Sequence, residues 1–536
     1  MHIRLDRRAI LKAGVALSAV ASGALVACTE ADDKPADAAT ERPLVNTAYG
    51  PVRGMVEDGV MVFKGVRYAA DTATTRFAAP VAPEPWTDQV DTIAYGASAP
   101  QVGGGDGGGL FASWRQDPPL PTSEDCLFLN VWTPSVETGA RPVMVWFHGG
   151  GFATGSGSAY AYDGVRLANR GDVVVVTVNH RLNQFGYLNL AHYGERFAMS
   201  PAAGVMDMIF ALEWVRDNIA AFGGDPSNVM IFGESGGGAK VCTLLSSERA
   251  KGLFHRAAVQ SGPWIAHPPV AVVQKAADEV VAKLGLTADT IDAILTLPVE
   301  DIQAASKGVV GAGSSPTIDG SVLTRDPFSP NAAPAGADVP LLIGCNRTEG
   351  TSLDGTADPT LFDLTWETLP VRLQMAFPGR DIGKIIDAYK ADYPDIEAPE
   401  LYFMAGADAR FFQGSVTVAD RKSDQGGAPI WFYMLDWETP VMGGKRYVPH
   451  ALDIGMVFDN VAKSESMSGP PGPAPQAIAD QMSESWLAFA KSGDPSNAVI
   501  GTWPTYTREQ RNMMVFRTQP GVETDIRAKE RALLTG

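Results

Sequence analysis

Short, continuous runs of β-branched and other apolar residues recur through this chain, and they restrict its possible folds more than any other feature. The runs lie at 143–147, 173–178, 229–232, 257–259, 341–344 and 430–435. Such runs are typical of strands that are buried on both faces of a mostly parallel sheet. Between the second and third runs, apolar residues recur at helical spacing from Val205 to Ile219. This alternation of strand and helix patterns predicts an α/β fold with a doubly wound central sheet.

The remainder of the sequence indicates that residues 44–520 form a single large unit. Further elements are expected as antiparallel strands at 52–56 and 60–66, a mobile glycine-rich loop at 103–109 and a helix at 476–491. We find no internal repeat and no linker within 44–520. We therefore expect one domain over 44–520, followed by a C-terminal tail at 521–536.

The first residues have the organisation of an export signal. Arg7 and Arg8 precede an apolar run of small residues that reaches Ala27, which resembles a twin-arginine signal. Leu25-Val26-Ala27-Cys28 resembles a bacterial lipobox, in which the cysteine is lipidated; the alternative is an ordinary cleaved signal. We expect a signal peptide at 1–27, a flexible tether at 28–43 and an exported protein of the periplasm or cell envelope, attached to the membrane through a lipid on Cys28.

The charge balance and the cysteines exclude some classes of partner and site. The formal net charge is −18 at pH 7, whereas binding to nucleic acid requires clustered Lys and Arg. Cys126, Cys242 and Cys345 lie in apolar contexts, where buried free thiols are expected. Because no CxxC pattern or His/Cys cluster is present, we expect no metal site, and the chemistry described below needs no cofactor.

A candidate nucleophile follows the third apolar run. The run 229–232 leads directly into Gly233-Glu234-Ser235-Gly236-Gly237, and an apolar helical stretch comes next. This is the GxSxG pattern in the strand–turn–helix context that exposes a nucleophilic serine. Glycines two positions before and after the serine prevent collisions with neighbouring backbone in the strained turn. A lone GxSxG pattern is weak evidence, but this context makes Ser235 the candidate nucleophile.

A second glycine-rich motif follows the first apolar run, which ends in His148-Gly149-Gly150-Gly151. Acyl transfer creates an oxyanion that must be met by preorganised N–H donors, and a run of glycines lets backbone amides approach the reacting carbon. We predict an oxyanion hole made by the N–H groups of Gly150, Gly151 and Gly236. His148 is expected to hold the loop rather than to act as a base.

The general base is found by elimination. In this fold the nucleophile comes first along the chain, the acid second and the histidine last. Only His255, His267 and His450 follow Ser235, and the first two lie too close to it to leave room for a strand that bears the acid. His450 is therefore the predicted base. Its function requires the neutral imidazole, so the rate should rise with pH through a pKa near about 6.5.

The acid should follow a strand between the serine and the histidine. Glu349 comes shortly after the run 341–344 and is the preferred candidate. Its carboxylate would hold the tautomer of the histidine and stabilise the imidazolium. On spacing alone, Asp354 remains the main alternative, with Asp319 and Asp408 as others.

At these positions the chain resembles the type-B carboxylesterases, the family of the cholinesterases and the bacterial p-nitrobenzyl esterases. Residues 222–237 match the active-site serine signature of the family and 124–131 match its second signature. The resemblance extends over 44–515. It implies the α/β-hydrolase fold: a mostly parallel doubly wound sheet, N-terminal antiparallel strands and helical cap insertions. It also favours Glu349 as the acid, because 346–350 matches the stretch that carries the glutamate of the family.

Two residues on the predicted helix after the serine are unusual. The residue that follows the nucleophile is usually Ala in the family, and here it is Gly236, whose N–H remains available. Lys240 lies five residues after Ser235 on the predicted helix, where a lysine needs a partner or an exit to water.

Together these features predict a carboxylic ester hydrolase that acts on a small-molecule ester by two-step acyl transfer. One alternative is a non-catalytic binding or adhesion protein on the same fold, of the kind found in a branch of the family that has lost the nucleophile. Another is an amidase or lactonase with the same three catalytic residues. The retention of Ser235, Glu349 and His450 argues against the first alternative.

Overall fold

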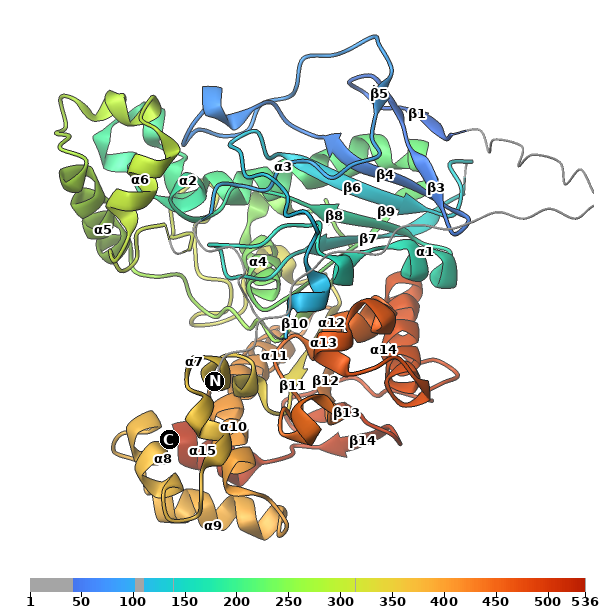
Figure 1. Ribbon diagram of the computed structural model, residues 1–536, viewed down its shortest axis with the longest axis vertical. Helices are drawn as coiled ribbons and strands as arrows, with labels where there is room; N and C mark the ends of the chain where they lie inside the picture. The colour runs from blue at the N-terminus through green and yellow to red at the C-terminus, as the bar shows by residue number, and fades with distance from the viewer. Residues whose placement is uncertain (1–41, 102–109, 138, 314, 536) are drawn as a thin grey trace, which may run out of the picture. The chain divides into compact units, whose positions relative to one another are not determined.

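The computed structural model describes residues 42–101, 110–137, 139–313 and 315–535 (Figure 1). The expected signal peptide at 1–27, Cys28 and most of the tether therefore lie outside the described residues. The glycine-rich segment 103–109, for which a mobile loop was predicted, also lies outside them.

A mixed sheet of eleven strands forms the centre of residues 42–535, in the order β14-β13-β12-β11-β10-β9-β7-β8-β6-β4-β3. The strands are β3 (Met55–Glu57), β4 (Val60–Arg67), β6 (Phe128–Thr133), β7 (Arg141–Phe147), β8 (Val174–Val178), β9 (Gly224–Glu234), β10 (Arg256–Gln260), β11 (Leu341–Asn346), β12 (Ile430–Leu435), β13 (Asn512–Phe516) and β14 (Gly521–Thr524). Neighbours from β8 to β13 pair in parallel, and the pairs at both edges are antiparallel. The predicted mostly parallel α/β sheet is thus confirmed.

A smaller sheet of three strands contains β1 (Leu44–Asn46), β2 (Pro51–Arg53) and β5 (Val90–Asp91). The single strand predicted at 52–56 is wrong in one respect, because Gly54 divides it between β2 and β3, which belong to different sheets. The hairpin that follows is present, since β3 pairs antiparallel with β4 across the turn at Asp58 and Gly59.

Alternate side chains of the central strands enter two separate cores. In β7, Val143, Val145 and Phe147 belong to one core, while Met144 and Trp146 belong to the other. This division follows from the period of two along a strand. Helices α3 (Ala203–Asn218) and α4 (Gly236–Ser246) pack into the first core, and α1 (Val165–Gly171) and α14 (Pro473–Ser492) pack into the second. The sheet is therefore covered by helices on both faces.

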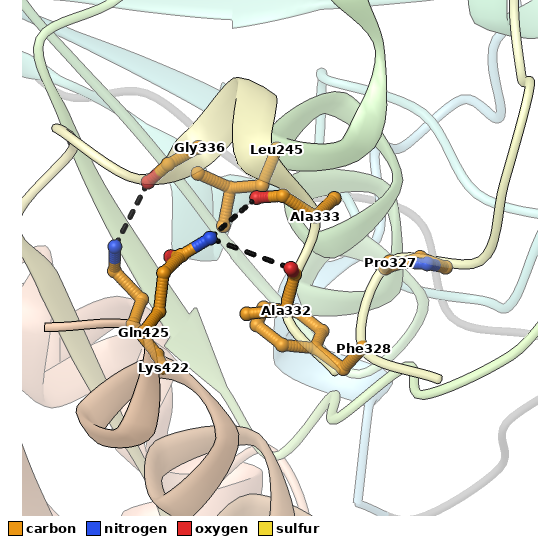
Figure 2. A pocket seen from close by; sticks show the side chains of 8 residues that line it. All are labelled: Leu245, Pro327, Phe328, Ala332, Ala333, Gly336, Lys422 and Gln425. Carbon is orange, nitrogen blue, oxygen red and sulfur yellow. Dashed lines mark hydrogen bonds between the residues drawn. The ribbon is translucent and has the colours of Figure 1, made fainter. Parts of the chain in front are cut away.

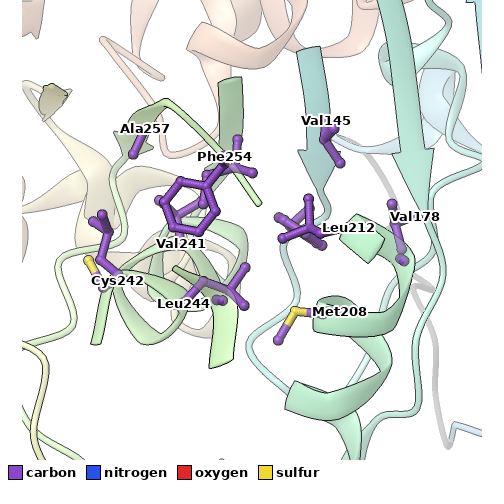
Figure 3. Close-up of a cluster of buried hydrophobic side chains, with 14 of the residues drawn as sticks. Val145, Val178, Met208, Leu212, Val241, Cys242, Leu244, Phe254 and Ala257 are labelled. Atoms are coloured by element: carbon purple, nitrogen blue, oxygen red, sulfur yellow. The ribbon is translucent and has the colours of Figure 1, made fainter. Parts of the chain in front are cut away.

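Figure 3 shows part of the first core, where α3 and α4 meet the strands. The labelled side chains of this region include Val145 and Val178 from strands, Met208 and Leu212 from α3, and Val241, Cys242 and Leu244 from α4. All seven are at most 1 % exposed. The helix that carries the residues after Ser235 is thus fixed by apolar contacts along its length.

Two further hydrophobic clusters belong to helical insertions. The first cluster includes side chains of α2 (Asn183–Tyr187), α5 (Val270–Lys283) and α6 (Val299–Ser306); the second includes α8 (Leu369–Ala376), α9 (Ile382–Asp392), α10 (Ala398–Ala407) and α15 (Ala528–Thr535). The remaining helices are α7 (Asp354–Ala357), α11 (Gln413–Gln425), α12 (Leu452–Val457) and α13 (Glu465–Ser468). These insertions were expected only from the family resemblance.

The segment 521–535, for which a tail was predicted, contains β14 and α15. Between these two elements lies Arg527, which is 5 % exposed and donates hydrogen bonds to the carboxylate of Asp408 at distances from 2.8 to 3.0 Å. Asp408 begins a π-helical turn, Asp408–Phe412, between α10 and α11. The last residues of the chain are therefore attached to the middle of an insertion.

Helix α11 is attached to the loop before β11 by two long polar side chains (Figure 2). Nζ of the buried Lys422 donates to the carbonyl oxygens of Gly336 at 2.8 Å and Ala337 at 3.1 Å. Gln425 donates to the carbonyl oxygen of Ala333 at 3.0 Å. The cavity between them measures about 10 Å³, which is room for about one water molecule. These contacts have a structural role.

Candidate active site

Ser235 occupies a strained turn between the end of β9 and the start of α4. Its backbone angles are φ 56° and ψ −120°, which an L-residue adopts only when the surroundings enforce it. Its N–H donates to the carbonyl oxygen of Gln260 at 2.8 Å, and its own carbonyl accepts from Ala239 at 3.0 Å. A Cβ at Gly237 would lie 2.0 Å from the carbonyl oxygen of Phe147. The predicted steric need for glycine beside the serine is confirmed at this position.

The segment His148–Phe152, named the glycine loop below, lies against the N-terminal end of α4. Gly150 and Gly151 have φ values of +83° and +62°, in the left-handed region that favours glycine. Within the described part of the chain, the N–H groups of both residues donate no hydrogen bond. Gly236 begins α4, so its N–H has no acceptor within the helix. The three predicted donors are therefore unpaired backbone amides.

His148 is buried. Its Nδ1 lies 2.8 Å from the carbonyl oxygen of Gly149, and its ring stacks on the ring of His180 with centroids 4.9 Å apart. Burial lowers the pKa of His148 well below its usual value. These contacts agree with its expected role in holding the loop.

His450 and Glu349 meet in the interior. Nδ1 of His450 lies 2.5 Å from Oε2 of Glu349. The other carboxylate oxygen, Oε1, accepts hydrogen bonds from Ser261 Oγ at 2.6 Å and from the N–H of Asn346 at 2.8 Å. A carboxylate only accepts, so Nδ1 carries the proton and Nε2 is left for other contacts. The glutamate therefore fixes the orientation of the imidazole.

The three alternative acids have other partners. Asp319 accepts from backbone N–H groups of its own turn, Asp354 pairs with Arg410, and Asp408 pairs with Arg527. In the described ranges, none of these three carboxylates forms an ion pair or hydrogen bond with His450.

A second carboxylate contacts the histidine from the other side. Nε2 of His450 lies 3.2 Å from Oε1 of Glu234, and both side chains are at most 5 % exposed. No hydrogen bond between Ser235 Oγ and His450 is formed in the portion of the chain that is described. This contact was not predicted, because no spacing pattern links residue 234 to residue 450.

The two carboxylates change the protonation of the histidine. Burial alone would lower the pKa of His450, but the charges of Glu234 and Glu349 outweigh it and raise the pKa to about 9. This pKa lies above the ordinary value that was expected from the sequence. Burial also raises the pKa of Glu234 well above its usual value. The pKa values of Glu234 and His450 are therefore both raised, and their side chains lie next to each other.

Ser235 opens onto a pocket of about 260 Å³. Its walls include the aromatic side chains of Phe152, Trp264 and Phe411. Phe411 belongs to the π-helical turn, and its ring centroid lies 5.1 Å from that of His450. Arg410, on the same turn, also lines the pocket and pairs with an aspartate of α7. The sequence has no signature of a π-helical turn, so these wall residues were not predicted.

The described cysteines and acidic residues form neither a disulfide nor a metal-binding group. Cys126, Cys242 and Cys345 are buried and free, as predicted. The described residues contain no group of three or more His, Cys, Asp or Glu that could hold a metal ion.

Comparison with known proteins shows the family to which the chain belongs. Residues 41–534 match the model of the carboxylesterase family. The para-nitrobenzyl esterase of Bacillus subtilis (strain 168) is 35% identical over 510 residues, which cover 92% of this chain and 98% of that protein. The fumonisin B1 esterase of Sphingopyxis macrogoltabida is 31% identical over 513 residues, which cover 91% of this chain and 89% of that protein.

Solved structures give the same result. A carboxylesterase of Geobacillus stearothermophilus superposes with a TM-score of 0.79 at 34% identity, covering 92% of this chain and 100% of that chain. An esterase of Clostridium hathewayi that can hydrolyse aliphatic aromatic polyesters superposes with a TM-score of 0.80 at 31% identity, covering 92% and 98%. The chain has the α/β-hydrolase fold, belongs to the carboxylesterase family and is a carboxylic ester hydrolase.

Proposed function

We propose that this enzyme hydrolyses small-molecule carboxylic esters through an acyl-enzyme on Ser235, with His450 as the general base and Glu349 as the acid that orients it. The observation that carries this proposal is the 2.5 Å contact between His450 Nδ1 and Glu349 beside the pocket that Ser235 lines. The strained turn at Ser235 adds support, since such backbone strain is concentrated at functional sites.

In the first step, Ser235 Oγ bonds to the carbonyl carbon of the ester while His450 Nε2 takes the hydroxyl proton. The imidazolium then gives this proton to the alcohol oxygen as the carbon–oxygen bond breaks, and the alcohol leaves. Water attacks the acyl-enzyme by the same route and releases the carboxylic acid and free Ser235. Before the first step, Nε2 must exchange its contact with Glu234 for one with the serine hydroxyl.

The oxyanion of each tetrahedral intermediate is proposed to accept hydrogen bonds from the N–H groups of Gly150, Gly151 and Gly236. Two observations support this role. The N–H groups of Gly150 and Gly151 form no other hydrogen bond in the described part of the structure, and Gly236 lies at the positive end of the α4 dipole. Donors that are already aligned cost no reorganisation during the reaction.

A covalent probe tests the proposed nucleophile. Purified protein that begins after residue 40 is treated with a fluorophosphonate, and the adduct is located by peptide mass while p-nitrophenyl acetate hydrolysis is followed. We expect an adduct on Ser235 that abolishes turnover and is missing in Ser235→Ala. An adduct on another serine, or full turnover by Ser235→Ala, would contradict the proposal.

Turnover of different substrates distinguishes ester hydrolysis from the alternative amidase and lactonase reactions. Matched ester, amide and lactone substrates should show turnover of the ester and far slower turnover of the others. A folded sample that turns over none of them and takes up no probe would favour a non-catalytic binding protein on the same fold.

The walls of the pocket suggest the kind of ester. Phe152, Trp264 and Phe411 present apolar aromatic surface next to Ser235. Relatives are named for a p-nitrobenzyl ester and for fumonisin B1. We propose that one side of the substrate ester is an apolar or aromatic group. A series of p-nitrophenyl esters of increasing acyl size, compared by kcat/KM, tests this.

We also propose that the protein is exported and carries a lipid on Cys28. The support is the twin arginine at 7–8 and the lipobox-like sequence that ends at Cys28. Labelling with a radioactive fatty acid in the producing cell should mark the wild type and not Cys28→Ala. Release of a soluble, unlabelled, shortened wild-type protein would instead support an ordinary cleaved signal.

A further inference from the structure

Lys240 is a buried lysine for which the proposed mechanism has no use. It lies on α4, five residues after Ser235, and its side chain is 0 % exposed. No carboxylate pairs with it among the described residues. Its Nζ donates a hydrogen bond to the carbonyl oxygen of His148 at 2.7 Å and lies 5.8 Å from the ring centroid of Phe152. A lysine amine is costly to bury, so contacts to both ends of the glycine loop require an explanation.

The surroundings of Lys240 favour uncharged groups. Burial lowers the pKa of its amine well below the usual value. Burial and the nearby Lys240 also lower the pKa values of His148 and His180. Each of these imidazoles directs Nδ1 at a backbone carbonyl, of Gly149 and Arg181 respectively. The amine of Lys240 therefore donates to the loop from surroundings in which burial disfavours positive charge.

A second residue of α4 controls the distance to the same loop. A Cβ at Gly236 would lie 2.3 Å from both the N and the O atoms of Gly151 and 2.4 Å from its Cα. All three atoms are backbone, so no flexible side chain could move aside. The glycine loop therefore occupies the space that a side chain at residue 236 would need.

Gly236 and Lys240 are four residues apart, so they lie on the same face of α4, one turn from each other. One permits the close approach of Gly151, and the other donates to the carbonyl at the start of the loop. Gly236 and Lys240 are also the two residues after Ser235 that are unusual in the sequence.

We propose that Lys240 and Gly236 act together as positioning residues that fix the glycine loop against α4, so that the N–H groups of Gly150 and Gly151 point at the developing oxyanion. This inference rests on the proposed function, in which those amides form the oxyanion hole. Lys240 does not line the pocket and acts only through the backbone of the loop. Gly236 keeps its proposed N–H donor to the oxyanion, and its lack of a side chain additionally permits the position of the loop.

The first test replaces Lys240 with Met, which keeps the length and apolar stem but removes the N–H donor. With p-nitrophenyl acetate we expect kcat to fall by about 10- to 100-fold while KM changes by less than about threefold, since a misplaced oxyanion donor acts on the transition state. The matched control is Lys422→Met, which removes another buried lysine that donates to backbone carbonyls, far from the loop in sequence and without a contact to it. Its kcat should stay within about twofold of the wild type.

The second readout separates positioning from general stability. A trifluoromethyl ketone analogue of the ester adds to Ser235 and forms a tetrahedral oxyanion, whereas the matching methyl ketone binds mainly in the ground state. Lys240→Met should weaken the trifluoromethyl ketone by the same factor as kcat and leave the methyl ketone unchanged. Equal losses for both ketones, or equal loss of kcat in Lys422→Met, would overturn the proposal.

Gly236→Ala tests the same idea independently, and it remains informative even if Lys240→Met does not fold. Its Cβ must displace Gly151, so kcat and trifluoromethyl ketone affinity should again fall together. In the double variant, the combined loss should be smaller than the product of the two single losses, because the loop is already displaced. Independent, multiplicative losses would contradict joint action on one loop. The absence of a Ser235 adduct in the wild type would contradict the proposed function, and this inference would fail with it. Normal labelling of Ser235 without the expected losses in the variants would contradict this inference alone.

Discussion

Nε2 of His450 lies 3.2 Å from Oε1 of Glu234, the residue that immediately precedes Ser235. The imidazole is thus held between two carboxylates, because Nδ1 contacts Glu349 at 2.5 Å. The serine hydroxyl requires the same nitrogen. The charges of Glu234 and Glu349 raise the pKa of His450, so the pH at which the base becomes available depends on a residue outside the proposed Ser–His–Glu triad.

Glu234→Gln should move the pH dependence of the reaction. The carboxylates of Glu234 and Glu349 raise the pKa of His450 to about 9 against the opposing effect of burial, so loss of one charge lowers this pKa. Since the base must be neutral, the rising limb of kcat/KM should move to lower pH. If the pKa of His450 falls by about 1, the neutral fraction of the imidazole at pH 7 increases about tenfold. The measurement is a kcat/KM profile from acidic to alkaline pH, and an unchanged limb would show that Glu234 does not set it.

Ser261→Ala should weaken the support of the proposed acid. Ser261 Oγ donates to Glu349 Oε1 at 2.6 Å, and its loss leaves a buried carboxylate with fewer donors. We expect the free energy of unfolding to fall by about 1.5–3 kcal/mol and kcat to fall with it. Urea unfolding and steady-state kinetics measure both. Ser246→Ala is the control, because Ser246 Oγ donates to a neutral carbonyl within α4 at 2.7 Å; it should cost less stability and spare kcat.

Trp264→Ala should change the preference for acyl size. Trp264 lines the pocket beside Ser235, and its ring packs on Phe152 with centroids 5.7 Å apart. Its removal should raise kcat/KM for p-nitrophenyl benzoate relative to the acetate by about tenfold or more. Trp366→Ala, at an exposed site under Lys390, should leave this ratio unchanged. A constant ratio in Trp264→Ala would mean that the aromatic wall does not contact the acyl group.

Arg527→Met should destabilise the protein strongly. Arg527 and Asp408 form a buried ion pair at 2.8 Å, and removal of one partner leaves an uncompensated charge. The expected loss is about 3–5 kcal/mol in the free energy of unfolding, measured by urea titration. The exposed pair between Arg216 and Asp217 gives the control, since Arg216→Met should cost about 0–1 kcal/mol. Similar losses in the two variants would contradict this distinction.

Local patterns in the sequence were sufficient for the centre of the fold. The apolar runs that become β7 to β12 and the helical spacing that becomes α3 are local signals, because a strand buried on both faces needs apolar residues at every position. Strand β6 was missed because polar Asn130 and Thr133 interrupt its apolar run. The edge strand β14 was missed because it is short and Val522 is its only large apolar residue. Its neighbour β13, which lies between β14 and β12, was missed with it.

The catalytic residues whose order along the chain is fixed in this fold could be predicted from the sequence. The contacts that depend on packing between distant segments could not. Motif context selected Ser235, and order and elimination selected His450; the family resemblance favoured Glu349. The contact of Glu234 with His450 joins segments far apart in sequence, and the π-helical turn that carries Phe411 has no known sequence pattern. The buried position of Lys240 also depends on the glycine loop that covers it.

The ion pair between Arg527 and Asp408 has a consequence for the pocket of Ser235. Phe411, in the turn that Asp408 begins, forms one wall of that pocket, and Arg527 holds the first residue of the turn from a segment 119 positions further along the chain. A truncation that removes Arg527 would therefore leave this wall without its support, although every residue of the proposed triad would still be present.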